Sequence, residues 1–267
     1  MLRLSALYRY PLKSGKAQAL QQIGLDKLGL EGDRRWMLVD EASGRFLTQR
    51  AVAKMSQLTA LWNTAGGLTL SSPGYPTLDV ALPGTDALRG VTLWHDSLRV
   101  PDAGDAAAAW VSAFIGKPTR LVHMPIDRAR TTEAGYGLDD DKVGFADGYP
   151  LLLIGQASLE DLCAQIGRPM EMLRFRPNLV IEGGEAFAED GWKRLRIGDM
   201  EFRVVKPCSR CVLTTVDPQT GERSPDREPF ATLQAYRGTE KGAMFGQNLV
   251  NDGVGRLEVG MPVTVLE

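Results

Sequence analysis

Cys208 and Cys211 lie three positions apart, and their type and spacing suggest a chemical role more directly than any other residues of the sequence. They lie in the segment KPCSRCVLTTVD, and only one further cysteine, Cys163, occurs in the 267 residues. From spacing alone the pair can serve as a redox couple, half of a zinc site, a disulfide, or a single thiolate that ligates a soft or redox-active metal. It can also have no chemical role.

The surrounding residues weigh against three of these uses. A redox couple of the thioredoxin type needs its first cysteine at the start of a helix, whereas residues 212–217 are rich in Val and Thr and predict a strand. A structural zinc site needs four ligands, and the remaining candidates, Cys163, His95 and His123, are not at paired spacings. A disulfide is rare in a reducing compartment. A metal-binding thiolate and the absence of any role therefore remain open.

Composition restricts the partners and the compartment. The 31 basic and 33 acidic residues give a formal net charge of −2, which argues against a general nucleic-acid binder. No apolar stretch is long enough for a signal peptide or a membrane span, and three cysteines suit a reducing environment. We expect a cytoplasmic protein that binds neither nucleic acid nor membranes.

Strand patterns outnumber helix patterns along the chain. Short β-type runs separated by Gly, Pro and Asp fill residues 36–101 and 179–265, and helical patterns cover only residues 105–116 and 157–168. Strands and helices do not alternate regularly, so a doubly wound parallel sheet is not expected. The prediction is a β-rich α+β chain of barrel-like sheets with a few helices, divided near residue 120.

Several segments resemble the MOSC family in their order and spacing. In the C-terminal half these are FADGYPLLLIGQASLEDL, RFRPNLVIEGGEAFAEDGW, KPCSRCVLTTVDPQTG, EPFATLQAYR and FGQNL. In the N-terminal half YPLKS, GLEGDRRWMLVD and FLTQR resemble the β-barrel domain that accompanies MOSC domains. The resemblance implies an N-terminal MOSC-associated β-barrel domain over residues 1–120 and a MOSC domain over residues 121–267.

Within that family the layout is similar to the amidoxime-reducing proteins of mitochondria and their bacterial relatives. The resemblance implies a molybdenum-dependent oxidoreductase that holds molybdenum through molybdopterin and reduces N-hydroxylated compounds. In the family pattern the second cysteine of the pair is the metal ligand, which places the catalytic and metal-binding role on Cys211. Spacing alone does not choose between Cys208 and Cys211.

The resemblance also assigns contacts to the phosphate of the cofactor. Lys13 and Ser14 in YPLKS and Arg34 in GDRRW match the phosphate contacts of the family. Their chemistry suits that role, because Lys offers a point charge, Ser a hydroxyl donor, and Arg a planar fork that binds phosphate in a bidentate manner.

Two further segments supply the remaining cofactor contacts that the resemblance implies. Arg176 and Asn178 flank Pro177, which disfavours a helical conformation for the residue before it, so we expect both side chains to leave an extended segment on the same side. In FGQN, Gln247 and Asn248 offer amide donors and acceptors to the cofactor.

The resemblance also bears on how the cofactor is reduced. Some bacterial relatives carry a ferredoxin domain with four cysteine ligands, which this sequence lacks. We therefore expect electrons from a separate protein resembling a ferredoxin or a flavin reductase, and a small N-hydroxylated substrate. Two alternatives keep the same thiolate: a sulfur carrier with a persulfide on Cys211, and a non-catalytic protein that binds or delivers molybdopterin.

Overall fold

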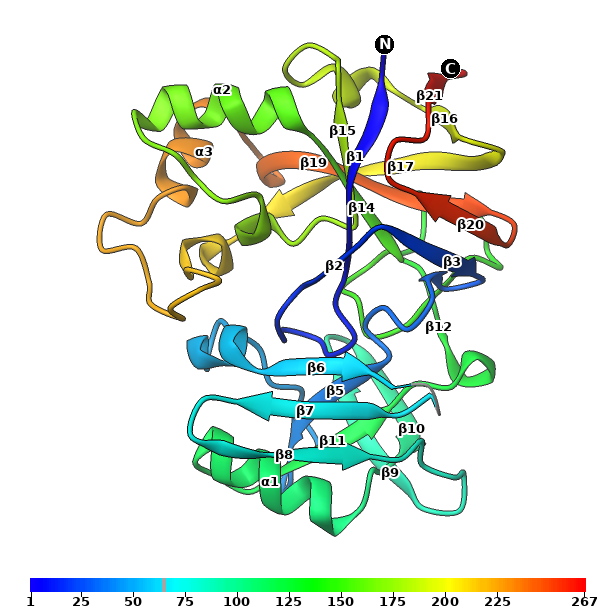
Figure 1. Ribbon diagram of the computed structural model, residues 1–267, viewed down its shortest axis with the longest axis vertical. Helices are drawn as coiled ribbons and strands as arrows, with labels where there is room; N and C mark the ends of the chain where they lie inside the picture. Colours follow the sequence, from blue (N-terminus) through cyan, green and yellow to red (C-terminus); the bar gives the residue numbers. More distant parts are fainter. Residues whose placement is uncertain (64–65) are drawn as a thin grey trace.

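The computed structural model describes residues 1–63 and 66–267, and these form two lobes stacked along the long axis of the molecule (Figure 1). The upper lobe contains a large sheet with the helices α2 (Gln156–Ile166) and α3 (Phe230–Tyr236) beside it, and both chain termini lie at its far end. The lower lobe contains smaller sheets and the helix α1 (Asp105–Ile115).

The large sheet has nine strands in the order β2-β1-β15-β14-β19-β17-β16-β21, with β18 paired to β19. Its strands are β1 (Arg3–Arg9), β2 (Gln18–Leu20), β14 (Leu151–Gly155), β15 (Leu179–Glu182), β16 (Arg194–Ile197), β17 (Met200–Arg210), β18 (Gly238–Thr239), β19 (Gly242–Asp252) and β21 (Val263–Val265). The ladder does not close into a barrel, although a single bridge between Arg3 and Pro262 brings its end back beside β1. Backbone hydrogen bonds also join Leu4 to Gly260 and Met261, so the sheet is barrel-like although its ladder is not closed.

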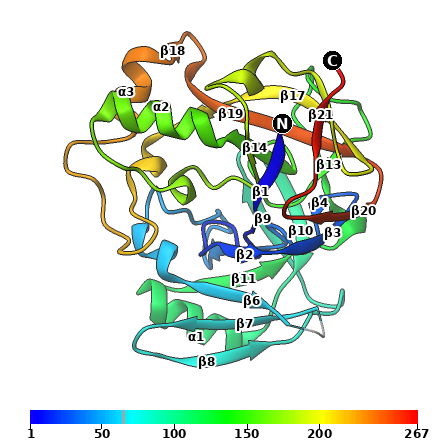
Figure 2. The ribbon, with the colours of Figure 1, turned by 45° about the horizontal axis from the view of Figure 1, so that its top comes forward.

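The smaller sheets lie below and beside the large one (Figure 2). The ladders of the lower lobe are β5 (Trp36–Asp40) with β11 (Thr119–His123), β9 (Leu88–Leu93) with β10 (Asp96–Pro101), and β6 (Thr59–Trp62), β7 (Leu68–Ser72) and β8 (Tyr75–Val80). Two more join the lobes: β3 (Gln22–Asp26) with β4 (Gly29–Leu30) and β20 (Gly255–Glu258), and β12 (Arg130–Thr131) with β13 (Lys142–Val143). Short 3-10 turns complete the chain at Ala53–Gln57, Ile126–Arg128, Met172–Phe175, Ala188–Gly191 and Val212–Thr215.

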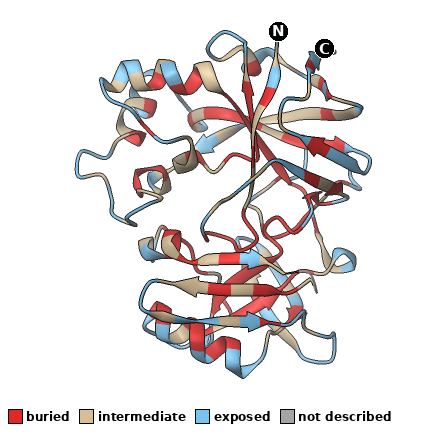
Figure 3. Cartoon of the chain, viewed as in Figure 1, coloured by how far each residue is buried: buried red, intermediate tan, exposed pale blue. Residues whose placement is uncertain are grey.

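Each lobe has its own apolar core, visible as buried segments in Figure 3. In the upper lobe, alternate residues of neighbouring strands meet on one face of the sheet, as Leu195 on β16 does with Phe202 on β17. In the lower lobe, α1 buries Val111 and Phe114, three positions apart, in the core that also contains Trp36. These cores fix the ends of β1, β5, β14 and β17, which border the junction between the lobes.

The β-rich α+β class expected from the sequence is confirmed, with three α-helices in the described part of the chain. The first strands do not stay within the lower lobe, because β1 pairs with β15 and β3 pairs with β20. The division between residues 1–120 and residues 121–267 remains a prediction. Among the described residues, no helix combines the length and the apolar character that crossing a membrane requires.

The core of the upper lobe yields a stability prediction. Phe202 is fully buried between strands, so Phe202→Ala removes apolar contacts and leaves a cavity. We expect it to lower the free energy of unfolding by about 3–5 kcal/mol, measured by urea denaturation. Val254→Ala, at a position that is 65% exposed in the turn before β20, is the control and should change the free energy by less than about 0.5 kcal/mol. Equal losses in the two variants would contradict the assignment of this core.

Candidate functional site

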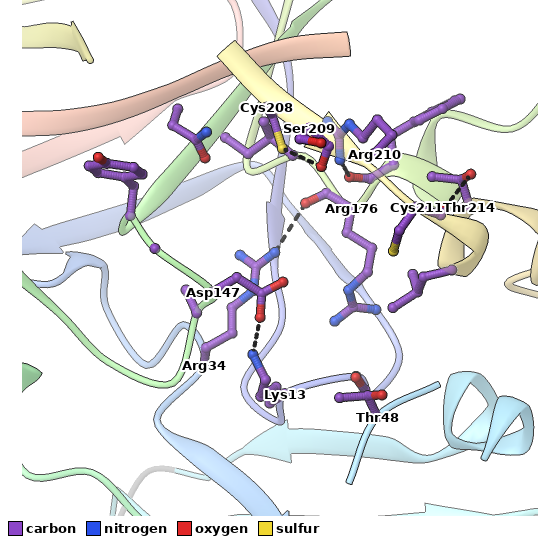
Figure 4. A pocket seen from close by; sticks show the side chains of 18 of the residues that line it. Lys13, Arg34, Thr48, Asp147, Arg176, Cys208, Ser209, Arg210, Cys211 and Thr214 are labelled. Atoms are coloured by element: carbon purple, nitrogen blue, oxygen red, sulfur yellow. Dashed lines mark hydrogen bonds and ion pairs between the residues drawn. The ribbon is translucent and has the colours of Figure 1, made fainter. Parts of the chain in front are cut away.

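A cavity of about 150 Å³ lies where the ends of strands from both lobes meet. Seven segments of the chain line it, and they bring together most of the polar residues that the sequence marks as candidates (Figure 4). In this view Lys13 and Thr48 lie on one side, and Cys208 and Cys211 lie on the opposite side. The cavity is therefore a meeting point of residues that are more than 190 positions apart in the sequence.

Positive charge dominates the lining of this cavity. Asp147 is the one carboxylate among its lining residues in the described part of the chain, against six basic side chains: Lys13, Arg34, Arg50, Arg174, Arg176 and Arg210. Ionised groups are rarely buried without a partner of opposite charge. An excess of cations in one cavity is therefore typical of a site that receives an anion.

Lys13 is almost completely buried on one side of the cavity. Its Nζ donates to the backbone oxygen of Phe145 at 2.7 Å and to Oδ1 of Asp147 at 2.5 Å. Burial lowers the pKa of Lys13, although Asp147 partly offsets that effect. Partial loss of hydration tends to raise the pKa of Asp147, whose side chain is still 63% exposed, but the charges of Lys13 and Arg50 outweigh it and lower this pKa to about 2. Asp147 is thus a carboxylate at neutral pH.

Arg34 and Asn178 join the N-terminal segment to the segment that precedes β15. One guanidinium nitrogen of Arg34 donates to Oδ2 of Asp33 at 2.5 Å and to Oδ1 of Asn178 at 2.9 Å. The other donates to the backbone oxygen of Arg176 at 3.0 Å, a bond drawn in Figure 4. Asn178 is held in turn by a bond from its Nδ2 to the oxygen of Tyr8. The fork of Arg34 is therefore fixed in place by partners on two segments.

Arg176 does not have the extended backbone that we expected before Pro177. Its φ and ψ of 56° and 46° are left-handed, so the prediction of an extended segment was wrong. The reason is tertiary: its amide closes the turn Met172–Phe175 on Leu173, and its guanidinium donates to the oxygen of Gly15 at 2.8 Å. Arg176 and Asn178 line the cavity nevertheless.

Three of the lining residues share an uncommon backbone conformation. Ser14, Arg34 and Arg176 have φ values of 62°, 45° and 56°, in the left-handed region that non-glycine residues rarely occupy. Such strain persists only where the surrounding structure enforces it, and it concentrates at functional sites. All three residues are among those predicted to contact the cofactor.

The cysteine pair lies at the end of β17, and both thiols are free and line the cavity. The strand predicted for residues 212–217 was wrong, because β17 ends at Arg210 and a 3-10 turn, Val212–Thr215, follows. The hydroxyls of Thr214 and Thr215 donate to the backbone oxygens three residues earlier, at 3.0 and 2.7 Å. These local bonds replace the strand ladder.

The two thiols have different surroundings. Cys208 packs partly against the apolar cluster that contains Phe175 and Phe245, and burial raises the pKa of its thiol while the charge of Arg210 partly offsets this. Cys211 is half-buried at the start of the 3-10 turn. Within the described residues, no group of three or more His, Cys, Asp and Glu side chains is arranged to hold a metal ion.

Gln247 and Asn248, which are neighbours in β19, face different sides of the sheet, because successive side chains of a strand point to opposite faces. Asn248 lines the cavity, and its Nδ2 donates to the oxygen of Lys206 at 3.1 Å. Gln247 does not line it; its Nε2 donates to Asp190 at 2.7 Å on the other face. Strand periodicity alone signals that only one of these two residues faces the site.

Seven of the eight predicted site residues therefore surround one cavity, and Gln247 does not. Sequence reasoning missed Thr48, Arg50 and Trp94. Trp94 lies beside the cavity, since its indole N–H donates to Asp147 at 3.2 Å and its ring stacks on Arg50 at 4.5 Å. Thr48 and Arg50 belong to FLTQR, a segment that resembles the family, which is a signal that could have found them. Trp94 lies in none of those segments, and only the tertiary fold brings it to the site.

Comparisons with known proteins find a match to a known domain in each half of the chain. Residues 1–118 match the MOSC N-terminal beta barrel domain, and residues 140–264 match the MOSC domain. The chain is 34% identical to the human mitochondrial amidoxime-reducing component 1, an alignment that covers 98% of this chain and 82% of that protein. It is 33% identical to the zebrafish (Danio rerio) component 1 and 30% identical to the human component 2, with 97% of this chain covered in each case and 83% and 82% of those proteins.

The lowered pKa of Lys13 yields a prediction about pH. Anion affinity that depends on Lys13 is present while its ammonium is protonated and is lost as the pH rises through its pKa. Because burial lowers that pKa below the ordinary value of a lysine, we expect the loss of affinity to begin below the pH expected for an exposed lysine. Binding of sulfate, whose charge stays constant over this range, measures the effect by calorimetry.

Lys13→Arg is the matched control, because a guanidinium remains protonated where an ammonium does not. We expect the affinity of wild type for sulfate to fall at least about fivefold further than that of Lys13→Arg across this pH range. Parallel pH profiles would show that Lys13 is not part of the anion site.

Proposed function

The chain belongs to the family of MOSC-domain proteins that includes the mitochondrial amidoxime-reducing components, and on that premise we propose that it is a molybdenum-cofactor-dependent reductase of N-hydroxylated compounds. The observation that carries the proposal is the excess of basic side chains, two of them buried, beside a free thiol in one cavity. The proposed anion is the phosphate of molybdopterin, and the proposed metal ligand is the thiolate of Cys211.

The residues present fit such a group. Two residues of the cavity lining each have a buried guanidinium nitrogen without a hydrogen-bond partner in the described part of the chain, Nη2 of Arg176 and Nη2 of Arg210. The guanidiniums of these two residues otherwise donate to backbone oxygens of Gly15, Phe175 and Phe245. A buried donor without a partner costs about 1–3 kcal/mol, and more when it is charged. Phosphate and pterin oxygens are acceptors that suit these donors.

Different groups on the cavity wall suit different parts of the cofactor. Lys13, Ser14 and Arg34 would hold the phosphate, because they combine two cations with a hydroxyl donor on neighbouring segments. Arg176, Asn178 and Asn248, which line the cavity as well, would contact the remaining polar atoms. We leave Gln247 out of this contact set, because its amide is bonded to Asp190 outside the cavity.

The cofactor, when bound, supplies the two-electron chemistry that converts an N–O bond to N–H with release of water. The chain contributes position and charge. Cys211 must be deprotonated to ligate a metal, and metal binding favours the thiolate over the thiol. The surrounding cations offset the negative charge that this thiolate and the phosphate bring into a partly buried cavity. We further propose that the two electrons come from a separate protein of the ferredoxin or flavin reductase class.

The cysteine pair provides the test of this proposal. We expect Cys211→Ala to lose molybdenum and to lower the rate of benzamidoxime reduction, driven by an artificial reductant, at least about 100-fold. Cys208→Ala should keep most of the molybdenum and most of the reduction rate, because Cys208 packs partly against an apolar cluster. Elemental analysis and a single-substrate assay of protein from a host that makes molybdopterin measure these effects.

The outcomes separate the proposal from its alternatives. Equal losses in Cys208→Ala and Cys211→Ala would contradict the assignment of the metal ligand. A protein that carries a persulfide on Cys211 without molybdenum would indicate a sulfur carrier. Full molybdenum content with no turnover of any N-hydroxylated compound would indicate a protein that binds or delivers the cofactor.

A further inference from the structure

Tyr10 is a buried residue next to the proposed site that does not line the main cavity. It is 1% exposed and follows directly after β1. Its backbone N–H donates to Oδ1 of Asp33 at 2.7 Å, and its backbone oxygen accepts from the N–H of Arg34 at 2.7 Å. The backbone of Tyr10 is therefore fixed to the segment that carries Arg34.

The ring of Tyr10 lies between two guanidiniums of the cavity. Cζ of Arg34 lies 4.2 Å from the centre of the ring, and Cζ of Arg176 lies 4.1 Å from it. Two guanidiniums cannot both occupy the space over one face at these distances, so they lie over opposite faces. Tyr10 thus separates a cation from the N-terminal segment and a cation from the segment before β15.

The ring between them offsets the repulsion between the positively charged guanidiniums of Arg34 and Arg176. The face of an aromatic ring carries partial negative charge, and it attracts a cation placed over it. Arg34 also has the carboxylate of Asp33 at 2.5 Å, whereas the side chain of Arg176 donates to the neutral backbone oxygen of Gly15. Burial lowers the pKa of Arg176 to about 10, and the charge of Arg34 adds to this. The ring therefore matters most for Arg176.

The hydroxyl of Tyr10 takes no visible part in this arrangement. It is buried without a hydrogen-bond partner within the described part of the chain. The interaction with both arginines therefore depends on the faces of the ring, which phenylalanine shares and leucine lacks. That difference makes the role of the ring separable from the role of the hydroxyl.

We propose that Tyr10 is a positioning residue of the anion site, whose ring spaces Arg34 and Arg176 and holds both guanidiniums at the cavity. The identity of the anion as a cofactor phosphate rests on the proposed function. The spacing of the two arginines does not rest on the proposed function, because it depends on this chain alone.

Sulfate binding to cofactor-free protein tests the proposal by calorimetry. We expect Tyr10→Phe to bind sulfate within about threefold of wild type, and Tyr10→Leu to bind at least about tenfold more weakly because both cation–π contacts are lost. Phe202→Leu is the matched control, since it removes a fully buried ring from the core of the upper lobe and should leave the sulfate affinity unchanged. Wild-type affinity in Tyr10→Leu would overturn the proposal, as would an equal loss in Phe202→Leu.

NMR of the arginine side chains tests the geometry without any anion. The Nε–H resonances of Arg34 and Arg176, assigned with the Arg34→Lys and Arg176→Lys variants, should show ring-current shifts in wild type and Tyr10→Phe and lose them in Tyr10→Leu. Shifts that persist in Tyr10→Leu would overturn the role of the ring. If wild type binds no sulfate, the proposed anion site fails, while these resonances still decide whether Tyr10 spaces the two arginines.

Discussion

Buried positive charge at the junction of the lobes is the constraint on which the rest of the site depends. Removing a charged side chain from water costs several kcal/mol unless partners replace the lost hydration. The structure supplies part of that replacement, with Asp147 on Lys13, Asp33 and Asn178 on Arg34, and the ring of Tyr10 between Arg34 and Arg176. The unpartnered guanidinium nitrogens show that the replacement is incomplete within the chain. An anion of the right shape would complete it.

The same constraint accounts for the strained backbone around the cavity. Ser14, Arg34 and Arg176 adopt left-handed conformations that cost of order 1–3 kcal/mol each. Two well-packed cores hold the flanking strands in place and make this strain tolerable. Rigid lobes with a strained, cation-rich seam between them are suited to holding a large anionic cofactor in one orientation, which is the part of the chemistry that the protein itself must supply.

Sequence reasoning located the site better than it described local structure. The motifs that contain Lys13, Arg34, Arg176 and Cys211 lie far apart in the chain, and the fold brings all of them to one cavity. Local rules failed where tertiary contacts prevailed: Arg176 is left-handed despite Pro177, and threonine hydroxyls turn the chain after Cys211 where β-branched residues predicted a strand. Tyr10 belongs to YPLKS and Arg50 to FLTQR, two segments that resemble the family, but the roles of both residues depend on neighbours that only the folded chain provides.

We propose that the sulfur of Cys211 ligates the metal of a cofactor bound in this cavity. Alkylation by iodoacetamide, followed by mass spectrometry at each cysteine, tests it most directly. Protein from a host that makes molybdopterin is compared with protein from a host that cannot, and Cys163, which lies outside the cavity, is the internal reference. The account predicts that loaded protein reacts at Cys211 at least about tenfold more slowly, because a metal-bound thiolate is unavailable as a nucleophile. Equal reaction at Cys211 in both samples would contradict it.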